Sequence, residues 1–142
     1  MSDRLILALD VGGSSVKSAL VTNHQHILGQ VQEDAITSGA GAPEILNTLA
    51  AIISAHLEHA GDLCRIAFAF PGPFDYVQGI SFIHKQARYD ALYGLRLGTE
   101  LKKILGTPTL EICFRNVAEA AILGEALYGA GVSYARLHAL YF

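Results

Sequence analysis

Two runs of strand-forming residues joined by a glycine-rich turn open the chain, and this order limits the folds available to it. Residues 5–9 are an apolar run that ends at Asp10, and two glycines and two serines follow at residues 12–15. Residues 16–21 (VKSALV) resume with β-formers and lack helical periodicity, so they predict a second strand, and residues 26–32 predict a third. A chain that opens as a β-meander is not a pure βαβαβ winding.

The remainder of the chain alternates helices and strands. Apolar residues recur at three- and four-residue spacing behind Pro43, which predicts a helix that ends at Gly61. The following segments predict a strand over 65–70, a hairpin over 74–83 turning near 78–79, a helix over 97–105, a strand over 109–114, a helix over 118–128 with Asn116 as its N-cap, and a last strand over 136–142. This order predicts an α/β fold with a mixed β-sheet flanked by helices.

The composition is that of a chain that either has a large interior or lacks a partner surface. Half of the 142 residues (51%) are hydrophobic and only 16% are charged, against about 25% in an average soluble domain. The net charge of −3 and the absence of Lys/Arg runs argue against a nucleic-acid partner. No apolar segment approaches the roughly 20 residues of a membrane span, and no signal peptide is apparent, so we expect a cytoplasmic protein with no membrane partner.

Potential metal ligands are few. Cys64 and Cys113 both lie in apolar runs, which predicts reduced, buried strand residues rather than a disulfide or a metal site. His56 and His59 lie three residues apart near a helix end, and without further ligands they predict a solvated helix surface rather than a zinc site. The sequence therefore predicts no metal cluster.

The turn after the first strand is a candidate anion site. It places a carboxylate at a strand end, followed by two glycines and two hydroxyls: Asp10, Gly12, Gly13, Ser14 and Ser15. Glycines permit positive φ and close approach of a ligand, and consecutive turn amides form an anion-binding nest. The carboxylate is well placed to hold hydrated Mg²⁺, and Lys17 adds a positive charge. The alternative is a plain hairpin turn with a capping aspartate; neither GxxxxGK[ST] nor GxGxxG is present.

Three segments, in this order, resemble motifs of the ROK family of sugar kinases and repressors. Residues 7–17 (LALDVGGSSVK) resemble its first phosphate motif, D-x-G-G-T-x-x-K, with Ser14 in place of threonine. Residues 70–75 (FPGPFD), followed by Gly79, resemble the P-G-P-V-D…G segment beside the sugar. Residues 116–131 (NVAEAAILGEALYGAG) resemble N-D-A-N-A-A-A-L-G-E…G-A-G.

The resemblance implies the N-terminal lobe of an actin-like ATPase (ribonuclease H-like) fold, with a second lobe absent from residues 1–142. It implies ATP-dependent phosphorylation of a hexose, with ATP phosphates and Mg²⁺ bound by Asp10, Gly12, Gly13, Ser14, Ser15 and Lys17. On the sugar side it implies Gly72, Pro73, Asn116 and Glu119. The zinc cluster of the family would lie in the second lobe, so no zinc ligands are expected here.

The position of the family's general base departs from this pattern. Aligning back from residues 124–125 places the catalytic aspartate at Val117, and valine has no lone pair to accept a proton. A positioned base contributes about 10²- to 10⁴-fold. Glu119 lies two residues further on, and positions i and i+2 of a helix do not share a face, so we do not expect it to substitute.

The segment over residues 84–90 also departs from the family, since it lacks the family's asparagine and tryptophan. Gln86 and Asp90 either bind a sugar hydroxyl or are solvated loop residues. Because the second lobe and the base are both missing, we expect a chain that is inactive alone and binds nucleotide weakly.

Two other interpretations stay open: a non-catalytic sugar- or partner-binding module, and a fragment of a kinase. A repressor is disfavoured because no helix-turn-helix precedes the first strand. The apolar strand over residues 136–142 predicts a homo-oligomer, because an unpaired edge invites association.

Overall fold

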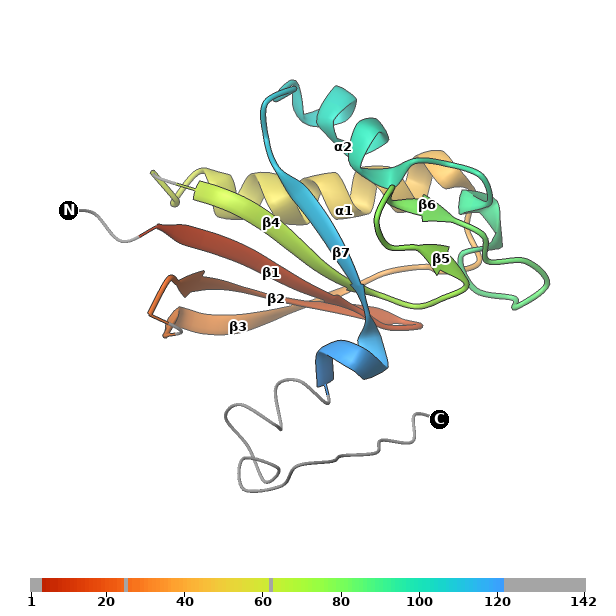
Figure 1. Cartoon of the computed structure of the whole chain (residues 1–142), viewed down its shortest axis with the longest axis horizontal. Helices are drawn as coiled ribbons and strands as arrows, with labels where there is room; N and C mark the ends of the chain where they lie inside the picture. Colours follow the sequence, from red (N-terminus) through yellow and green to blue (C-terminus); the bar gives the residue numbers. More distant parts are fainter. Residues whose placement is uncertain (1–3, 25, 62, 122–142) are drawn as a thin grey trace.

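A five-stranded mixed sheet forms the centre of the structure, a computed structural model that describes residues 4–24, 26–61 and 63–121 (Figure 1). Its strands are β1 (Leu5–Val11), β2 (Ser15–Thr22), β3 (Ile27–Ala35), β4 (Leu63–Phe70) and β7 (Ile112–Asn116), in the order β3-β2-β1-β4-β7. The first three strands are antiparallel neighbours, whereas β4 pairs parallel with β1, and β7 parallel with β4. The predicted α/β fold with a mixed sheet is confirmed, and a strand rather than a helix follows the glycine turn.

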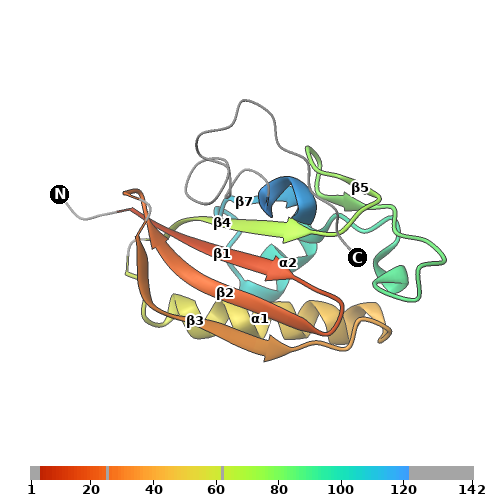
Figure 2. The ribbon, with the colours of Figure 1, turned by 90° about the horizontal axis from the view of Figure 1, so that it is seen from below.

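Two helices, α1 (Ala42–Leu57) and α2 (Leu97–Leu105), cover one face of this sheet (Figures 1 and 2). The apolar positions of α1 that recur at three- and four-residue spacing are buried: Ile45, Leu46, Leu49, Ile52 and Ile53. Alternate residues of β1 meet them, since Leu7, Leu9 and Val11 are at most 2% exposed. Each such side chain contributes about 1.5–3 kcal/mol when fully buried, so this alternation fixes which face of β1 meets the helices.

A small hairpin and a loop pack beside the carboxyl end of β4. The hairpin consists of β5 (Phe74–Asp75) and β6 (Ile80–Ser81), and its turn is closed by Asp75 Oδ1, which accepts hydrogen bonds from two backbone amides. The ring of Phe74 packs at a tilt against Phe70 and against Phe114 of β7, with ring centroids 5.2 Å apart in both pairs. These aromatic contacts hold the hairpin against the sheet. A short 3₁₀ helix over Asp90–Leu92, which was not predicted, follows the loop.

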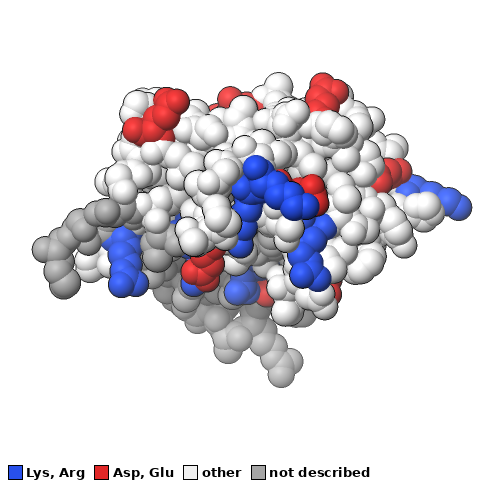
Figure 3. All heavy atoms as spheres, turned by 90° about the horizontal axis from the view of Figure 1, so that it is seen from above, with Lys and Arg blue, Asp and Glu red and all other residues white. Residues whose placement is uncertain are grey.

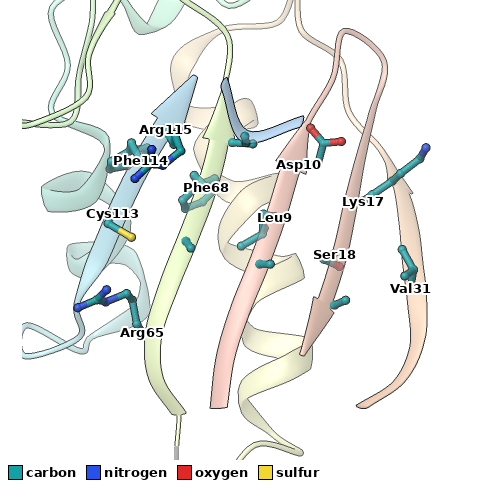
Figure 4. A pocket seen from close by; sticks show the side chains of 15 residues that line it. Leu9, Asp10, Lys17, Ser18, Val31, Arg65, Phe68, Cys113, Phe114 and Arg115 are labelled. Atoms are coloured by element: carbon teal, nitrogen blue, oxygen red, sulfur yellow. The ribbon is translucent and has the colours of Figure 1, made fainter. Parts of the chain in front are cut away.

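The face of the sheet opposite α1 and α2 is hollowed. It carries a cavity of about 540 Å³ between β2, β1, β4 and β7 (Figure 4). Small residues form much of its lining: Ala8, Ala19, Ala67 and Ala69. Charged side chains lie toward its margin, and two of them are paired within the chain, Arg65 with Glu111 and Arg115 with Glu119, each at 2.7 Å.

The surface carries scattered charge. On the face shown in Figure 3, most atoms belong to uncharged residues, and Lys and Arg side chains lie among Asp and Glu side chains. No helix in the described ranges is both long and apolar enough to span a membrane.

Several predicted boundaries differ from the structure. The third strand extends to Ala35 rather than to residue 32, because its pairing with β2 continues to the glycine turn. The last described strand covers Ile112–Asn116 rather than 109–114, and α1 ends at Leu57 rather than at Gly61. Residues 117–121 are helical, so the helix predicted over 118–128 begins one residue earlier. The rest of that helix and the strand predicted over 136–142 lie outside the described residues.

Two side-chain predictions also need correction. His56 is 7% exposed and its Nε2 lies 2.9 Å from Ser18 Oγ, so the solvated surface predicted for it is wrong, whereas His59 is exposed as predicted. His56 lies in the last turn of α1, whereas His59 lies in the turn that follows the helix. Cys113 is a free thiol, as predicted, but it is only half-buried because it lines the hollowed face of the sheet. The side chain of Cys64 is outside the described part.

Candidate functional site

Three segments far apart in the sequence meet at one edge of the sheet. Strands β1, β4 and β7 are parallel, so the residues that follow each of them lie at the same carboxyl edge, the usual place for ligands in α/β sheets. A cavity of about 340 Å³ lies there. Its lining consists of Asp10, Val11, Gly12, Gly13, Pro71, Gly72, Ile83, Gln86, Arg88, Tyr89 and Val117. We call this the edge cavity.

The glycine turn between β1 and β2 forms one wall of the edge cavity. The Gly12 amide donates a hydrogen bond to the Ser15 carbonyl (2.9 Å), which closes the turn. Neither Gly12 nor Gly13 adopts positive φ, so the conformational freedom expected for them is not what the turn uses. The turn needs glycine because a side chain would not fit. A Cβ on Gly13 would lie 2.8 Å from Arg88 Nη1, and a Cβ on Gly12 would lie 3.1 Å from the Ser15 carbonyl oxygen.

A strained loop forms the opposite wall. Lys85, Ala87 and Tyr89 all have left-handed backbone conformations, with φ of 56°, 60° and 62°. Each non-glycine residue in this region costs about 1–3 kcal/mol, and such strain concentrates at functional sites. The loop is held at Tyr89, whose amide donates to the Ser38 carbonyl (2.7 Å) and whose hydroxyl donates to the Gly12 carbonyl (2.5 Å).

Tyr89 ties the loop to the glycine turn in its neutral form. Its side chain is 1% exposed, and burial raises the pKa of Tyr89 to about 12, although the nearby charge of Arg88 opposes the rise. The phenol therefore keeps its proton throughout the physiological pH range and remains a donor to Gly12.

A chain of hydrogen bonds sets the position of Val117. Tyr76 donates its hydroxyl proton to the Phe70 carbonyl (2.8 Å), and Asn116 Nδ2 donates to Tyr76 Oη (3.0 Å). Asn116 Oδ1 accepts from the amides of Ala118 (2.9 Å) and Glu119 (3.3 Å), which confirms the predicted N-cap. Burial raises the pKa of Tyr76, so this donor too stays protonated near neutral pH. Val117 thus begins the helix at a fixed place in the cavity wall.

The predicted site residues divide into two groups. Those that the fold brings together in the edge cavity are Asp10, Gly12, Gly13, Gly72 and Val117. Those that do not line it are Ser14, Ser15, Lys17, Pro73, Asn116 and Glu119. Asp10 and Lys17 are opposite each other in the β1–β2 register, and both line the hollowed face of the sheet (Figure 4). The Glu119 carboxylate pairs with Arg115 at 2.7 Å.

The motifs did not point to the residues of the strained loop that line the cavity. Arg88 and Tyr89 have no local signal, because the loop has neither strand nor helix periodicity. Ile83, the last residue of the predicted hairpin, also lines the cavity. Gln86 was considered for a sugar hydroxyl and does line the cavity. Asp90 does not line it, and its Oδ1 accepts a hydrogen bond from the Gln86 amide (3.1 Å), so it braces the loop.

The residues present fit a hydrated magnesium ion but not a cage of protein ligands. Asp10 is exposed at the end of β1, beside the turn, and Mg²⁺ commonly binds through one or two carboxylates while keeping several waters. No group of three or more His, Cys, Asp or Glu side chains suitable for a metal occurs in the described ranges. A single exposed carboxylate beside the turn matches the ion that accompanies nucleotide phosphates.

The mixed sheet with its two helices is an actin-like α/β fold, which solved ROK kinases share. The sequence profile of the ROK family matches residues 6–140, and the chain belongs to this family. No curated protein matches the chain by sequence.

Solved structures share the fold at low sequence identity. A ROK glucokinase from Streptomyces griseus, in complex with glucose and AMPPNP, is 21% identical with a TM-score of 0.72 over 89% of this chain and 38% of its own length. The inorganic polyphosphate/ATP-glucomannokinase from Arthrobacter sp. strain KM is 21% identical, with a TM-score of 0.74 over 92% of this chain and 51% of its own. A ROK transcriptional regulator, a homologue of the E. coli MLC protein, is 21% identical, with a TM-score of 0.71 over 90% and 31%. The chain thus spans between 31% and 51% of these proteins.

Proposed function

We propose that residues 1–142 form the N-terminal lobe of a ROK-type sugar kinase, which binds Mg-ATP phosphates and a hexose at the edge cavity. The observation that carries this proposal is the convergence of the three motif segments on one cavity, with Asp10, Gly12, Gly13 and Gly72 in its lining. The glucokinase with the same fold was solved with glucose and AMPPNP, which supports these two ligand classes.

Each residue of the turn has a role in this proposal. Mg-ATP, when bound, supplies the phosphoryl group. Asp10 holds the hydrated Mg²⁺, and the missing side chain of Gly12 lets phosphate oxygens reach the backbone amides of the turn. Ser14 and Ser15, which do not line the edge cavity, add hydroxyl donors only to a phosphate that extends beyond it. Lys17 lies on the hollowed face and contributes long-range charge.

On the sugar side, Gly72 gives a hydroxyl room to approach. A Cβ there would lie 3.2 Å from Tyr76 Oη, so a larger residue would displace the hydrogen bonds that position Val117. Pro73 and Asn116 act as positioning residues in this proposal, because they set the wall without lining it.

The proton of the attacking hydroxyl has no acceptor at Val117. Asp10 is the one carboxylate among the described lining residues, and it is committed to the metal. Glu119 is held by Arg115 and does not line the cavity. We therefore infer that the lobe binds and orients its ligands but transfers phosphate slowly, since positioning alone lacks the contribution of the base.

The same valine favours a second candidate, a non-catalytic sugar-binding module. An apolar side chain at the base position leaves binding intact and removes chemistry, which suits a sensor. The regulator with the same fold is consistent with this alternative.

Calorimetry on the full chain tests the proposal. We expect heat of binding for glucose and for Mg-ATP at millimolar concentration, and loss of the Mg-ATP signal in Asp10→Asn. Lys103→Gln, a charge removed from an exposed position on α2, is the control and should bind both ligands as the parent does. Absence of heat for both ligands would refute the proposal. Glucose binding without any hexose-dependent ADP release would favour the binding module over the slow kinase.

A further inference from the structure

Among the residues that the structure describes, no carboxylate pairs with Arg88, a cation in the lining of the edge cavity. In the ranges that the structure describes, the side chain of Arg88 takes part in no ion pair or hydrogen bond. Other arginines of the chain are occupied: Arg65 and Arg115 bind glutamates at 2.7 Å, and Arg96 donates to Gln78 at 3.0 Å. Arg88 is therefore available to a ligand.

The fold holds this guanidinium against the glycine turn. Arg88 Nη1 and Cδ lie 2.8 and 3.1 Å from where a Cβ on Gly13 would be, so the side chain uses the space that the glycine leaves. Its neighbours Ala87 and Tyr89 both have left-handed φ, and Tyr89 is tied to Gly12 and to Ser38. A strained and anchored loop that carries an unpaired cation to a cavity is preorganised for an anion.

The chemistry of the lining specifies the kind of anion. Guanidinium binds phosphate oxygens in a bidentate, charge-assisted manner. Val117 and Ile83 add apolar surface, and Gln86 adds an amide. Because Val117 takes the place of a carboxylate, one negative charge that would repel an anion is absent.

The size of the cavity limits the ligand further. Its volume of about 340 Å³ is at the lower end of the range of about 300–1,000 Å³ for small-molecule sites. That suits a sugar that carries one phosphate better than it suits a nucleotide triphosphate, most of which would lie outside.

We propose that the edge cavity binds a sugar monophosphate, with Arg88 holding its phosphate group against Gly13. This inference rests on the proposed function in one respect, that the edge cavity is the sugar site. It goes further by making the preferred sugar ligand a phosphorylated one, so the lobe would bind the phosphorylated form more tightly than the neutral hexose.

Titration of the full chain with glucose 6-phosphate, glucose and inorganic phosphate tests the proposal. Charge-assisted hydrogen bonds contribute about 1.5–3 kcal/mol, which predicts that glucose 6-phosphate binds about 10- to 100-fold more tightly than glucose. Arg88→Gln should remove this advantage, and Arg88→Lys should restore part of it. Lys85→Gln removes a charge from the same loop without touching the cavity lining and should bind like the parent.

The possible results separate this inference from the proposed function. The inference is overturned if glucose and glucose 6-phosphate bind equally tightly, or if Arg88→Gln binds the phosphate ester as tightly as the parent. In either case, binding of glucose and Mg-ATP would still support the proposed kinase lobe. If inorganic phosphate binds as tightly as glucose 6-phosphate, the claim that the ligand is a sugar is overturned. Arg88-dependent binding of the ester without any Mg-ATP binding sustains the inference and overturns the kinase. Thermal melting of each variant checks that it is folded.

Discussion

Gly79 offers a test of how the hairpin is held beside the edge cavity. It has φ of +73°, its amide donates to the Asp75 carbonyl (2.8 Å), and its carbonyl accepts from the Leu97 amide (2.9 Å). A Cβ at this position would lie 2.9 Å from Cε2 and 3.2 Å from Cδ2 of Phe114. Gly79→Ala therefore meets two penalties, one from the backbone and one from the ring.

The size of each penalty follows from the surroundings. Alanine in the left-handed region costs about 1–2 kcal/mol. The Phe114 ring is packed between Phe68 and Phe74, with centroids 5.2 Å away in both cases, so it cannot retreat without disturbing the core. Overpacking of this kind costs about 1–3 kcal/mol. Together they predict a loss of about 2–5 kcal/mol in the free energy of unfolding.

Two other glycines separate these penalties. Gly94 has φ of +78° and nothing within 4 Å of an added Cβ, so Gly94→Ala reports the backbone cost alone. Gly39 lacks positive φ and also has open space, so Gly39→Ala should be neutral or slightly stabilising.

Urea denaturation followed by circular dichroism measures all three variants. With a slope of about 2 kcal/mol per molar urea, the midpoint of Gly79→Ala should fall by about 1–2.5 M. A Gly79→Ala midpoint no lower than that of Gly94→Ala would refute the contact with Phe114, and with it the account of how the hairpin is fixed.

Three further predictions concern the site and the core. Val117→Asp restores a proton acceptor, so hexose-dependent ADP formation in a coupled assay should rise by about 10²- to 10⁴-fold over both the parent and the control Val117→Asn. An equal rate for all three proteins would contradict the assignment of the base position. Burial lowers the pKa of His56, although the Asp34 charge opposes this, so the folded state favours the neutral imidazole. The contribution of His56 to the free energy of unfolding should be fully present above pH of about 6.5 and should be lost as the pH falls through the lowered pKa. Urea midpoints measured at several pH values should show this decline, and His56→Gln should flatten it. Tyr89→Phe removes the hydrogen bond to the Gly12 carbonyl, so the free energy of unfolding should fall by about 0.5–1.5 kcal/mol and glucose 6-phosphate should bind more weakly. Unchanged affinity for the ester would show that this hydrogen bond does not set the position of Arg88.

The local patterns of the sequence determined most of the fold. The apolar run over residues 5–9 and the three- and four-residue spacing behind Pro43 are short-range signals, and the strands and helices follow them within a few residues. The three motif segments are also short stretches of sequence, so they could be found without the structure. The replacement of the family's aspartate by Val117 was found in the same way. Asn116 capped the helix as predicted, because a cap is a contact between near neighbours.

Only the tertiary structure decided which residues share the site. Parallel pairing of β1, β4 and β7 joins segments roughly sixty and a hundred residues apart, and no local period encodes such pairing. The same holds for Arg88 and Tyr89, whose loop takes its shape from bonds to Ser38 and Gly12, and for His56, which is buried because β2 places Ser18 above it. Gly13 also depends on a distant partner, since the space that its missing side chain leaves is occupied by the side chain of Arg88. A sequence specifies its elements through neighbours, whereas a site is assembled from contacts that exist only after those elements pack.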